Sequence, residues 1–284
     1  VGSLLGGITA SFYDSVVPNS GHVRINDARA ASALSPLGLD LLLPQAAAQA
    51  QRIKDLKDPR IVDVETLLPF AGLLVEDSSL GEPRNLPMRG IGLDPDTRFA
   101  DNVRQSIIAG AFLPGGEGIA LSDRAARLVG SGLGKTVLLL VQDASGQPWY
   151  ESVRVTGIFH TESSDFDETT FYIGQASASR ILDVEGRSRE IRILLSDRRD
   201  AEAVAGEIRA VLGDGAGSPL KVETWQSINA SVFTLLLFVS ILLYIIMGLF
   251  AVVAGTIIAN TSLVSVMERL REFGTMRAIG LRAS

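Results

Sequence analysis

The sequence predicts an α+β domain outside the cytoplasm, followed by a membrane-spanning α-helix. No Asp, Glu, Lys or Arg occurs from Thr224 to Met267, and the apolar part of that stretch, Val232 to Ile258, exceeds the roughly 20 residues that a helix needs to cross a bilayer. Strand-like and helix-like patterns alternate through the roughly 210 residues before it. The mean hydropathy of +0.27 fits one or two spans joined to a large aqueous domain.

The outer region is predicted to be a mixed series of strands and helices. Alternation of apolar and polar residues, as in Gly21 to Ile25, is typical of half-buried strands. Predicted strands cover residues 21–25, 61–64, 67–75, 86–93, 135–141, 150–159, 170–173, 192–195 and 220–224. We expect strand 170–173 to pair back across an acidic loop with the strand before it, and residues from about 86 to 173 to form a β-rich insert.

Three helices are predicted among these strands, over residues 41–56, 123–128 and 201–212. Ser122 is the expected N-cap of the second helix. In the third, apolar residues recur at three- and four-residue spacing from Ala201 to Leu212, Val211 included, which places one stripe against a sheet. Asp197 is its expected N-cap and Gly213 its C-terminal stop.

The flanks of the membrane span predict its orientation. Lys221 is the only nearby cation before the span, whereas four arginines follow it within about 20 residues. Because an excess of Lys and Arg marks the cytoplasmic face, we expect the C-terminal tail to be cytoplasmic. Small residues recur on one face of the span and predict close packing against a partner helix, unless they only reflect how common Gly and Ala are in membrane helices. They are Gly248, Ala251, Gly255 and Ala259.

The first ten residues are apolar, but they are too few to span a bilayer and lack the basic start of a signal peptide. We interpret them as the end of an earlier membrane helix; the alternative is a frayed N-terminal helix. The predicted organisation is therefore the end of one membrane helix over 1–10, an extracytoplasmic domain over 11–225, a transmembrane helix over 226–262 and a cytoplasmic segment over 263–284.

One glycine-rich segment, Gly130 to Thr136, looks like a phosphate-binding loop. A Walker A loop needs four residues between its first glycine and the Gly-Lys pair, and here Val129 stands where that glycine should be. A phosphate-binding loop also follows a strand and opens a helix, whereas this one follows a predicted helix and opens a strand. We therefore interpret it as a helix stop before a strand, and not as part of an ATPase.

Other chemistries have weak signatures. Four carboxylates at 162, 165, 167 and 168 lack the spacing and central glycine of a calcium-binding EF-hand, so we expect a solvated hairpin tip. The two histidines, His22 and His160, lie on or beside strands and belong to no recognisable catalytic or zinc motif. The absence of cysteine excludes disulfides, and a net charge of −6 argues against nucleic acid as a partner. We predict no metal site and no enzyme active site in the outer domain.

The charged tail after the span is predicted to dock a partner protein. It combines both charges with a phenylalanine and two glycines, in the residues Glu268, Arg269, Arg271, Glu272, Phe273, Gly274, Arg277 and Gly280. The alternative is a juxtamembrane anchor whose arginines hold lipid headgroups, but an anchor has no use for the glutamates. Because glycines allow bends, we expect a short second helix around Thr275 to Ile279 that leaves the membrane helix at an angle.

The segment from Val264 to Gly280 resembles the one that follows the second membrane helix in ABC permeases of the MacB, FtsX and LolC/LolE type. In that family the segment contains Glu-Arg, then Glu-Phe-Gly after two intervening residues, and then Arg-Ala-x-Gly. This chain has every one of these residues. Weaker matches to the periplasmic domain of that family occur in the right order at 21–25, 90–94, 107–113, 118–121 and 224–226.

The resemblance implies a permease subunit of a mechanotransmitting ABC transporter in the cytoplasmic (inner) membrane, with two more membrane helices than this chain shows. Its outer domain would combine a Porter-like α/β part with a β-rich, Sabre-like insert. An ABC ATP-binding subunit would bind the ATP and Mg²⁺ and push on residues 268–280, so this chain would bind no cofactor and catalyse no reaction. A second permease subunit would complete a homo- or heterodimer acting on a lipoprotein, another periplasmic protein, a peptide or a small molecule.

A second hypothesis comes from a different class of protein. A membrane-anchored sensor would also have an outer ligand-binding domain joined to one membrane helix. It would continue into a signalling domain after the tail, where a permease would continue into two further spans. The outer surface has no motif that identifies the molecule bound or moved.

Overall fold

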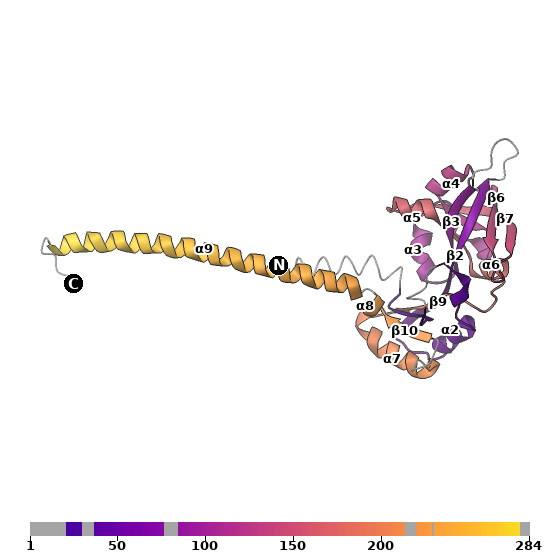
Figure 1. Cartoon of the computed structure of the whole chain (residues 1–284), viewed down its shortest axis with the longest axis horizontal. Helices are drawn as coiled ribbons and strands as arrows, with labels where there is room; N and C mark the ends of the chain where they lie inside the picture. Colours follow the sequence, from indigo (N-terminus) through magenta and orange to yellow (C-terminus); the bar gives the residue numbers. More distant parts are fainter. Residues whose placement is uncertain (1–20, 30–36, 77–84, 214–219, 229, 279–284) are drawn as a thin grey trace. The chain divides into compact units, whose positions relative to one another are not determined.

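A computed structural model describes the chain except for residues 1–20, 30–36, 77–84, 214–219, 229 and 279–284. The chain consists of two compact units, one up to Ile228 and the other from Asn229 onward. In the described residues the first unit, the outer domain, contains ten strands, and the second contains one long helix (Figure 1). The predicted membrane-helix end over 1–10 lies outside the described residues.

The strands of the outer domain form one mixed sheet with the order β10-β1-β9-β2-β3-β8-β5-β7-β4, and β6 pairs with both β2 and β7. Their bounds are β1 Val23–Asp27, β2 Ile61–Glu76, β3 Asn85–Leu93, β4 Ile107–Gly110, β5 Ile119–Ser122, β6 Thr136–Gln142, β7 Pro148–Phe159, β8 Thr170–Gly174, β9 Glu190–Leu195 and β10 Leu220–Thr224.

Six of these strands close into a ring. The pairings run from β2 to β3, β8, β5, β7, β6 and back to β2, so every strand of the ring has two hydrogen-bonded neighbours. Closure removes the open edges that a flat sheet of this length would expose. The remaining ladder, β10-β1-β9, joins the ring through the first half of β2, whose residues 61–67 pair with β9.

Two phenylalanines and a glycine pack together inside the ring. Phe70 and Phe171 are almost fully buried and meet edge to face, with ring centroids 5.8 Å apart. The Cα of Gly90 faces both rings, and a Cβ built there would lie 2.3 Å from Phe70 Cζ and 2.7 Å from Phe171 Cζ. Glycine at this position is therefore what allows the two aromatic rings to meet.

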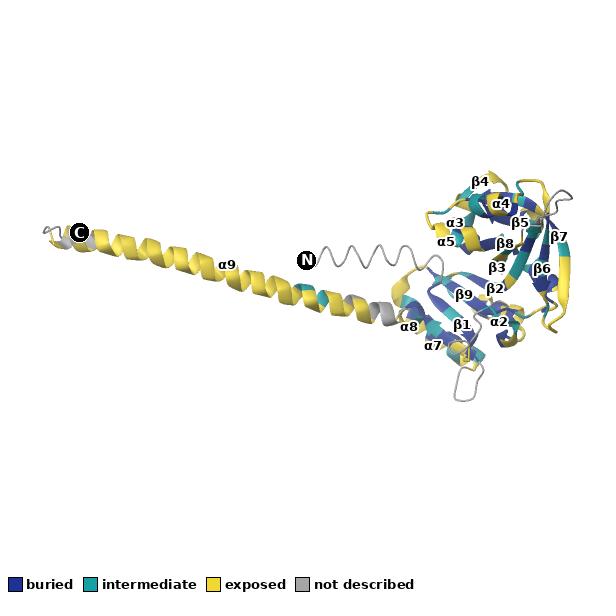
Figure 2. Cartoon of the chain, turned by 45° about the horizontal axis from the view of Figure 1, so that its top comes forward, coloured by how far each residue is buried: buried dark blue, intermediate teal, exposed yellow. Residues whose placement is uncertain are grey.

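Helices cover the sheet in the outer domain. They are α2 Ala46–Lys54, α3 Phe99–Gln105, α4 Asp123–Val129, α5 Ser164–Thr169, α6 Gln175–Ile181, α7 Ala201–Leu212 and α8 Trp225–Ile228, together with 3₁₀ turns η2 Leu39–Leu41, η3 Pro114–Gly116 and η4 Arg198–Asp200. Helix α7 packs on β10 and α2 packs on β2 and β9, so they cover the ladder, whereas α4, α5 and α6 pack on strands of the ring (Figures 1 and 2).

Several local predictions are confirmed. Ser122 caps α4 by accepting a hydrogen bond from the Ala125 amide at 2.9 Å, and Gly130 ends that helix in the left-handed conformation. Gly213 ends α7 in the same way. The predicted N-cap of α7 is wrong: Asp200 precedes that helix, and Asp197 instead caps the 3₁₀ turn η4, where its side chain accepts from the Arg199 amide at 2.9 Å. Val211, however, is 43% exposed and lies outside the buried stripe of that helix.

Three predictions about the strands and helices are wrong. Strand β8 does not pair back with β7, because β5 lies between them and pairs with both. The two strands expected over 61–75 are one strand that continues through Glu65 and Thr66. The helix expected from 41 begins only at Ala46, because the Leu43 amide donates to the Ser188 carbonyl and Pro44 disfavours helical geometry in the residue before it.

The chain enters and leaves the domain at the same end of the ladder. Strands β1 and β10 are antiparallel, with Val23 opposite Thr224. His22 joins this end: its carbonyl accepts from the Trp225 amide at 3.0 Å and its Nδ1 accepts from the Leu195 amide at 3.0 Å. Burial lowers the pKa of His22, which keeps the ring neutral as this acceptor.

The second unit is a single helix, α9 Ala230–Ala278, of 49 residues. Its apolar side chains are exposed along the helix, for example Phe250 at 69% (Figure 2). In the described residues, the one helical stretch long and apolar enough to cross a membrane is Leu237–Glu272, whose most apolar window has a mean hydropathy of 2.8 and no buried residue. A core helix of a water-soluble domain would be buried, so lipid is the solvent that suits this surface.

The predicted bend in the tail is wrong as far as Ala278. Helix α9 continues through Gly274 without a break. One glycine costs a helix only about 1 kcal/mol relative to alanine, and the neighbouring Leu, Arg, Glu and Met residues favour helix. The predicted transmembrane helix over 226–262 also differs in its limits, because α8 is a separate short helix and α9 starts at Ala230.

Candidate functional site

A cavity of about 730 Å³ opens beside the middle of β2, and we call it the β2 cavity. Apolar and aromatic side chains from β2, β3, α3, α5, β7 and β8 form much of its wall, including Leu67, Ile91, Phe99, Val103, Phe159, Phe166 and Tyr172. Three acidic residues, Glu65, Glu162 and Glu190, and two basic residues, Arg89 and Arg192, also line it. Small-molecule sites commonly combine such an apolar wall with a few polar groups.

Glu65 is the most buried charged residue of this cavity, at 2% exposure. Its Oε1 accepts from the Thr97 hydroxyl at 3.2 Å, and its Oε2 is buried without a hydrogen-bond partner. Arg192 stands opposite it in the β2–β9 register. Burial raises the pKa of Glu65 to about 8, although the nearby Arg192 opposes this rise, so the carboxyl is protonated at neutral pH.

Arg89 is a half-buried cation in the same cavity. Its guanidinium carbon lies 5.6 Å from the centroid of the Phe166 ring, and its Nη2 donates to the Thr170 hydroxyl at 3.2 Å. Its Nε is buried without a hydrogen-bond partner, and Arg89 forms no ion pair with any residue in the described part of the chain. Arg192, in contrast, pairs with Glu190 at 2.6 Å.

Tyr172 lies between these charged groups. Its ring packs against Phe159 and Phe166, with centroids 5.3 and 6.3 Å away. Burial raises the pKa of its hydroxyl, whereas the positive charges of Arg192 and Arg89 act in the opposite direction. The phenol is therefore a neutral hydrogen-bonding group on the aromatic wall of the cavity.

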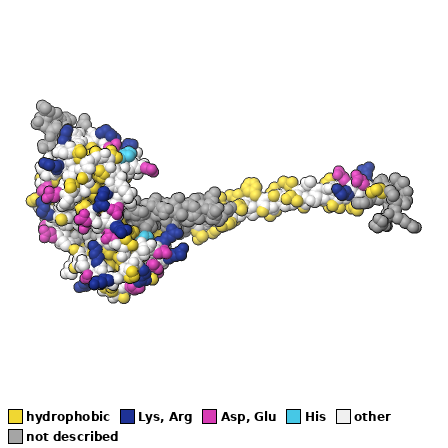
Figure 3. Space-filling model, turned by 180° about the vertical axis from the view of Figure 1, so that it is seen from behind, with side chains coloured by type: hydrophobic (Ala, Val, Ile, Leu, Met, Phe, Trp, Pro, Cys, Tyr) yellow, Lys and Arg dark blue, Asp and Glu magenta, His cyan; other side chains and the backbone are white. Residues whose placement is uncertain are grey.

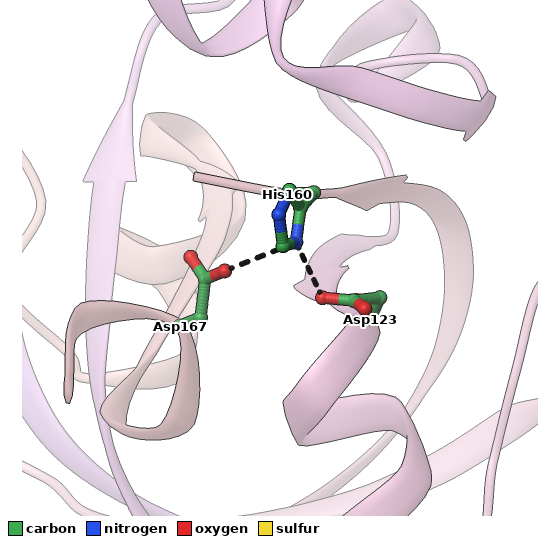
Figure 4. Close-up of side chains that lie close together, drawn as sticks. All are labelled: Asp123, His160 and Asp167. Carbon is green, nitrogen blue, oxygen red and sulfur yellow. Dashed lines mark hydrogen bonds and ion pairs between the residues drawn. The ribbon is translucent and has the colours of Figure 1, made fainter. Parts of the chain in front are cut away.

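A second group of titratable side chains lies where β7, α4 and α5 meet (Figure 4). His160 Nδ1 is 3.0 Å from Asp123 Oδ1 and 3.5 Å from Asp167 Oδ2. The bond to His160, helped by Arg127, lowers the pKa of Asp123. Asp167 is fully buried and accepts from both the amide and the hydroxyl of Thr161, at 3.1 and 2.6 Å.

These bonds decide what the cluster can do. The three residues are close enough to hold a metal ion, but Arg127 occupies Asp123 Oδ2 at 2.9 Å, and Thr161 and His160 occupy both oxygens of Asp167. The nearby Ser122 hydroxyl donates to the Asp167 carbonyl and not to His160, so no Ser-His-Asp relay forms. The cluster ties three elements together. The prediction of a solvated hairpin tip is wrong, because this loop contains α5 and the buried Asp167.

Two other candidate sites, a glycine-rich segment and a second cavity, do not have the arrangement that binding would require. The glycine-rich segment 130–136 links the end of α4 to the start of β6, the reverse of the order that a phosphate-binding loop requires. A polar cavity of about 780 Å³ is lined by four carboxylates, at Asp94, Asp96, Glu117 and Glu185. All four are exposed, so water screens their charges, and we assign this cavity no function.

The predicted site residues of the C-terminal part lie on α9. Gly248, Ala251, Gly255 and Ala259 are within its apolar stretch, and nothing lies within 4 Å of the Cβ positions of the two glycines. The charged residues begin at Glu268, and Figure 3 shows both charges gathered near the C-terminal end of the helix. Glu268, Arg269, Arg271 and Glu272 are exposed; Gly280 lies outside the described residues.

An α+β outer domain with a closed strand ring, joined to a membrane helix that continues into a charged segment, defines a class of membrane-anchored proteins. Family comparison identifies which one: the model of the MacB-like periplasmic core domain matches residues 1–211, and the model of the FtsX-like permease C-terminal region matches residues 244–284. The chain belongs to this MacB/FtsX family of ABC transporter permeases.

A solved structure supports the fold. The periplasmic region of MacB from Actinobacillus actinomycetemcomitans superimposes with a TM-score of 0.52 at 13% identity, over 77% of this chain and 96% of that one. The extracellular domain of the noncanonic ABC-type transporter YknZ from Gram-positive bacteria gives a TM-score of 0.47 at 15% identity, over 71% of this chain and 99% of that one. No curated protein sequence matches the chain.

Membership of this family fixes the coarse features of the protein. Its members are inner-membrane permeases with a periplasmic domain, and they work with an ABC ATPase in a membrane complex. The match over 244–284 favours a permease over the alternative sensor, because the tail itself fits the permease model.

Proposed function

We propose that this chain is the permease subunit through which a separate ABC ATPase moves the outer domain. The single observation that supports this most is the continuity of α9. One unbroken helix of 49 residues includes the apolar span and the charged segment from Glu268 to Ala278. A continuous helix is stiff over this length, so a push at one end is felt at the other.

The length of α9 fits such a role. At 1.5 Å per residue the helix is about 73 Å long, more than twice the roughly 30 Å of a bilayer core. The residues from Glu268 to Ala278 therefore extend roughly 16 Å past the apolar stretch. Arginines at 269, 271 and 277 support a cytoplasmic location for this end by the positive-inside rule, and an ATPase could contact it there.

The outer domain is arranged to respond to motion at its base. Strands β1 and β10 are neighbours, and the start of one pairs with the end of the other, so both chain connections leave from one end of the ladder. His22 and Trp225 bond the two connections to each other at that end. A displacement transmitted to this end would move the ladder and, through β2, the strand ring.

The remaining parts of the mechanism follow from this assignment. The ATP and Mg²⁺ belong to the ATPase subunit, and this chain contributes the contact residues Glu268, Arg269, Arg271, Glu272, Phe273, Gly274, Arg277 and Gly280. The face made by Gly248, Ala251, Gly255 and Ala259 packs against another helix, either within the permease or in a second permease subunit. The outer domain acts on a lipoprotein, a peptide or a small molecule outside the cytoplasm.

Charge reversal of the contact segment tests the proposal. In the complete permease co-expressed with its ATPase, Glu268→Lys combined with Arg271→Glu should reduce co-purification of the ATPase by roughly tenfold or more, because like charges at an interface repel. Arg180→Glu on the surface of α6 is the matched control and should have no effect, since its side chain is exposed and belongs to the outer domain. Undiminished ATPase recovery with the double variant would exclude the coupling role.

A further inference from the structure

We propose that the β2 cavity binds a single-chain amphiphilic anion, with the acidic headgroup on Arg89 and the hydrocarbon chain along the apolar wall. This inference goes beyond the coupling role of α9 and does not depend on it. It rests on the charge, the apolar lining and the volume of the cavity, each of which involves residues of the outer domain alone.

Charge balance within the cavity points to an anion. Arg89 has no carboxylate partner in the described part of the chain, and its Nε–H is buried without an acceptor. Arg192 and Glu190 neutralise each other at 2.6 Å. Glu162 also lines the cavity, but it is exposed and screened by water. A half-buried guanidinium without a counter-ion is costly, and an acidic headgroup would supply the missing partner.

The protonation state of Glu65 also suits an anion near Arg89. Glu65 Oε2 has no hydrogen-bond partner, and the raised pKa of this residue makes its carboxyl neutral at pH 7. A protonated carboxyl donates a hydrogen bond instead of adding a negative charge. The neutral Glu65 carboxyl therefore adds no negative charge that would repel an anion near Arg89.

The wall suits a hydrocarbon chain. Leu67, Ile91, Leu93, Phe99 and Val103 line the cavity together with the rings of Phe159 and Phe166. Its volume of about 730 Å³ lies within the range of roughly 300–1,000 Å³ that small-molecule sites have. A short hydrophilic anion would leave this wall in contact with water, whereas a long-chain carboxylate or a single-chain phosphate would cover it.

Photolabelling of the full chain in lipid vesicles tests the proposal. A palmitate probe with a photoactivatable diazirine on its chain enters both the bilayer and any site that binds it. We expect labelled peptides from β3, α3 and the segment after β7, in addition to peptides from α9. Arg89→Gln should reduce labelling of the outer domain by roughly tenfold, because a hydrogen bond to a charged group is lost. Labelling of α9 should not change and serves as the internal reference.

Matched variants and probes complete the experiment. Arg180→Gln removes a guanidinium outside the cavity and should leave domain labelling unchanged. If Arg89→Gln fails to fold, Val103→Trp fills the cavity without changing its charge and should have the same effect on labelling. A diazirine-bearing hexadecylamine should label the domain at least tenfold less than palmitate, since a cation would face Arg89.

Each result of the labelling experiment has a distinct meaning. Adding phosphatidylglycerol to the vesicles distinguishes the source of the anion: lower palmitate labelling means that phospholipid competes, and unchanged labelling means that a free acid is preferred. The proposal is overturned if only α9 is labelled, if Arg89→Gln and Val103→Trp label like the wild type, or if the amine labels the domain as well as the acid does. ATPase assembly is not measured in any arm, so the coupling role of α9 stands or fails separately.

Discussion

The outer domain and α9 use the same apolar residues in opposite ways. Phe171 is fully buried inside the strand ring, whereas Phe250 is 69% exposed on α9. The domain removes its apolar surface from water by folding, and its polar groups cover the outside. Helix α9 has no protein core of its own, and only lipid or a partner helix can cover it. One chain is thus built for two solvents, and stability has a different origin in each.

Charge shows the same contrast. The interior of the domain contains an acidic residue, Glu65, that protonation keeps neutral. The apolar stretch of α9 contains no Asp, Glu, Lys or Arg before Glu268. Both tryptophans, Trp149 and Trp225, belong to the outer domain, so intrinsic fluorescence of the full chain in vesicles follows the unfolding of the domain alone.

Truncating one phenylalanine in each region gives the largest expected difference. Phe171→Ala should lower the free energy of unfolding of the domain by about 3–5 kcal/mol, through lost burial and the cavity left beside Phe70. Phe250→Ala removes the same atoms from α9 and should leave that transition unchanged. Urea unfolding followed by tryptophan fluorescence measures both variants. Equal destabilisation would mean that the two regions share one core, contrary to their separation here.

A change of pH should act on the domain through Glu65. Its carboxyl ionises near pH 8 in the folded domain and near 4.5 when unfolded, so the folded state binds more protons between these values. Stability should therefore fall as the pH rises through this window, by up to about 5 kcal/mol in all. Below about pH 4.5 both states are protonated and this contribution is complete.

Replacing that carboxyl isolates its effect. Glu65→Gln cannot ionise, so the variant should lose the decline between about pH 5 and pH 9 and be more stable than the wild type at the alkaline end. Glu117→Gln, at an exposed carboxylate, is the control and should keep the wild-type slope. Parallel curves for Glu65→Gln and the wild type would show that Glu65 titrates normally.

The smallest expected effect compares two glycines of the outer domain. Gly90→Ala places a methyl group against Phe70 and Phe171 and should destabilise the domain by about 1–3 kcal/mol. Gly206→Ala lies in the middle of α7 with nothing within 4 Å of the new Cβ, and should stabilise it by up to about 1 kcal/mol. Thermal unfolding followed by fluorescence compares them, and destabilisation by both would mean that the ring interior has no special need for glycine.

Patterns that depend on neighbours in the chain were predictable. The caps of α4, the glycine that ends α7, the β6–β7 hairpin and the apolar span follow from residues a few positions apart. Contacts between distant segments were not. Nothing near Thr170 indicates that β5 separates β8 from β7, because β5 has only four residues and its partners are far away in sequence. The helix continues through Gly274, against the predicted bend, because one glycine costs a helix only about 1 kcal/mol and its neighbours favour helix.

The two candidate sites also differ in how far the sequence predicts them. The residues that we expect to contact the ATPase are adjacent in sequence and form a readable motif, although their role stays a prediction. The β2 cavity had no sequence signal beyond one clue: Glu65 and Thr66 interrupt an apolar pattern that continues on both sides. A polar interruption normally marks a strand end, and here it marks a buried carboxyl inside one strand.

The sequence by itself determined the membrane helix, the α+β character of the outer domain and the family, because each is encoded in local hydropathy, periodicity or a contiguous motif. Only the tertiary structure decided that six strands close into a ring and that Arg89 has no counter-ion among the residues that the structure describes. It also decided that Asp123, His160 and Asp167 meet. The physical reason is that burial and hydrogen bonding depend on which distant residues approach one another, and that is settled by packing of the whole domain at once.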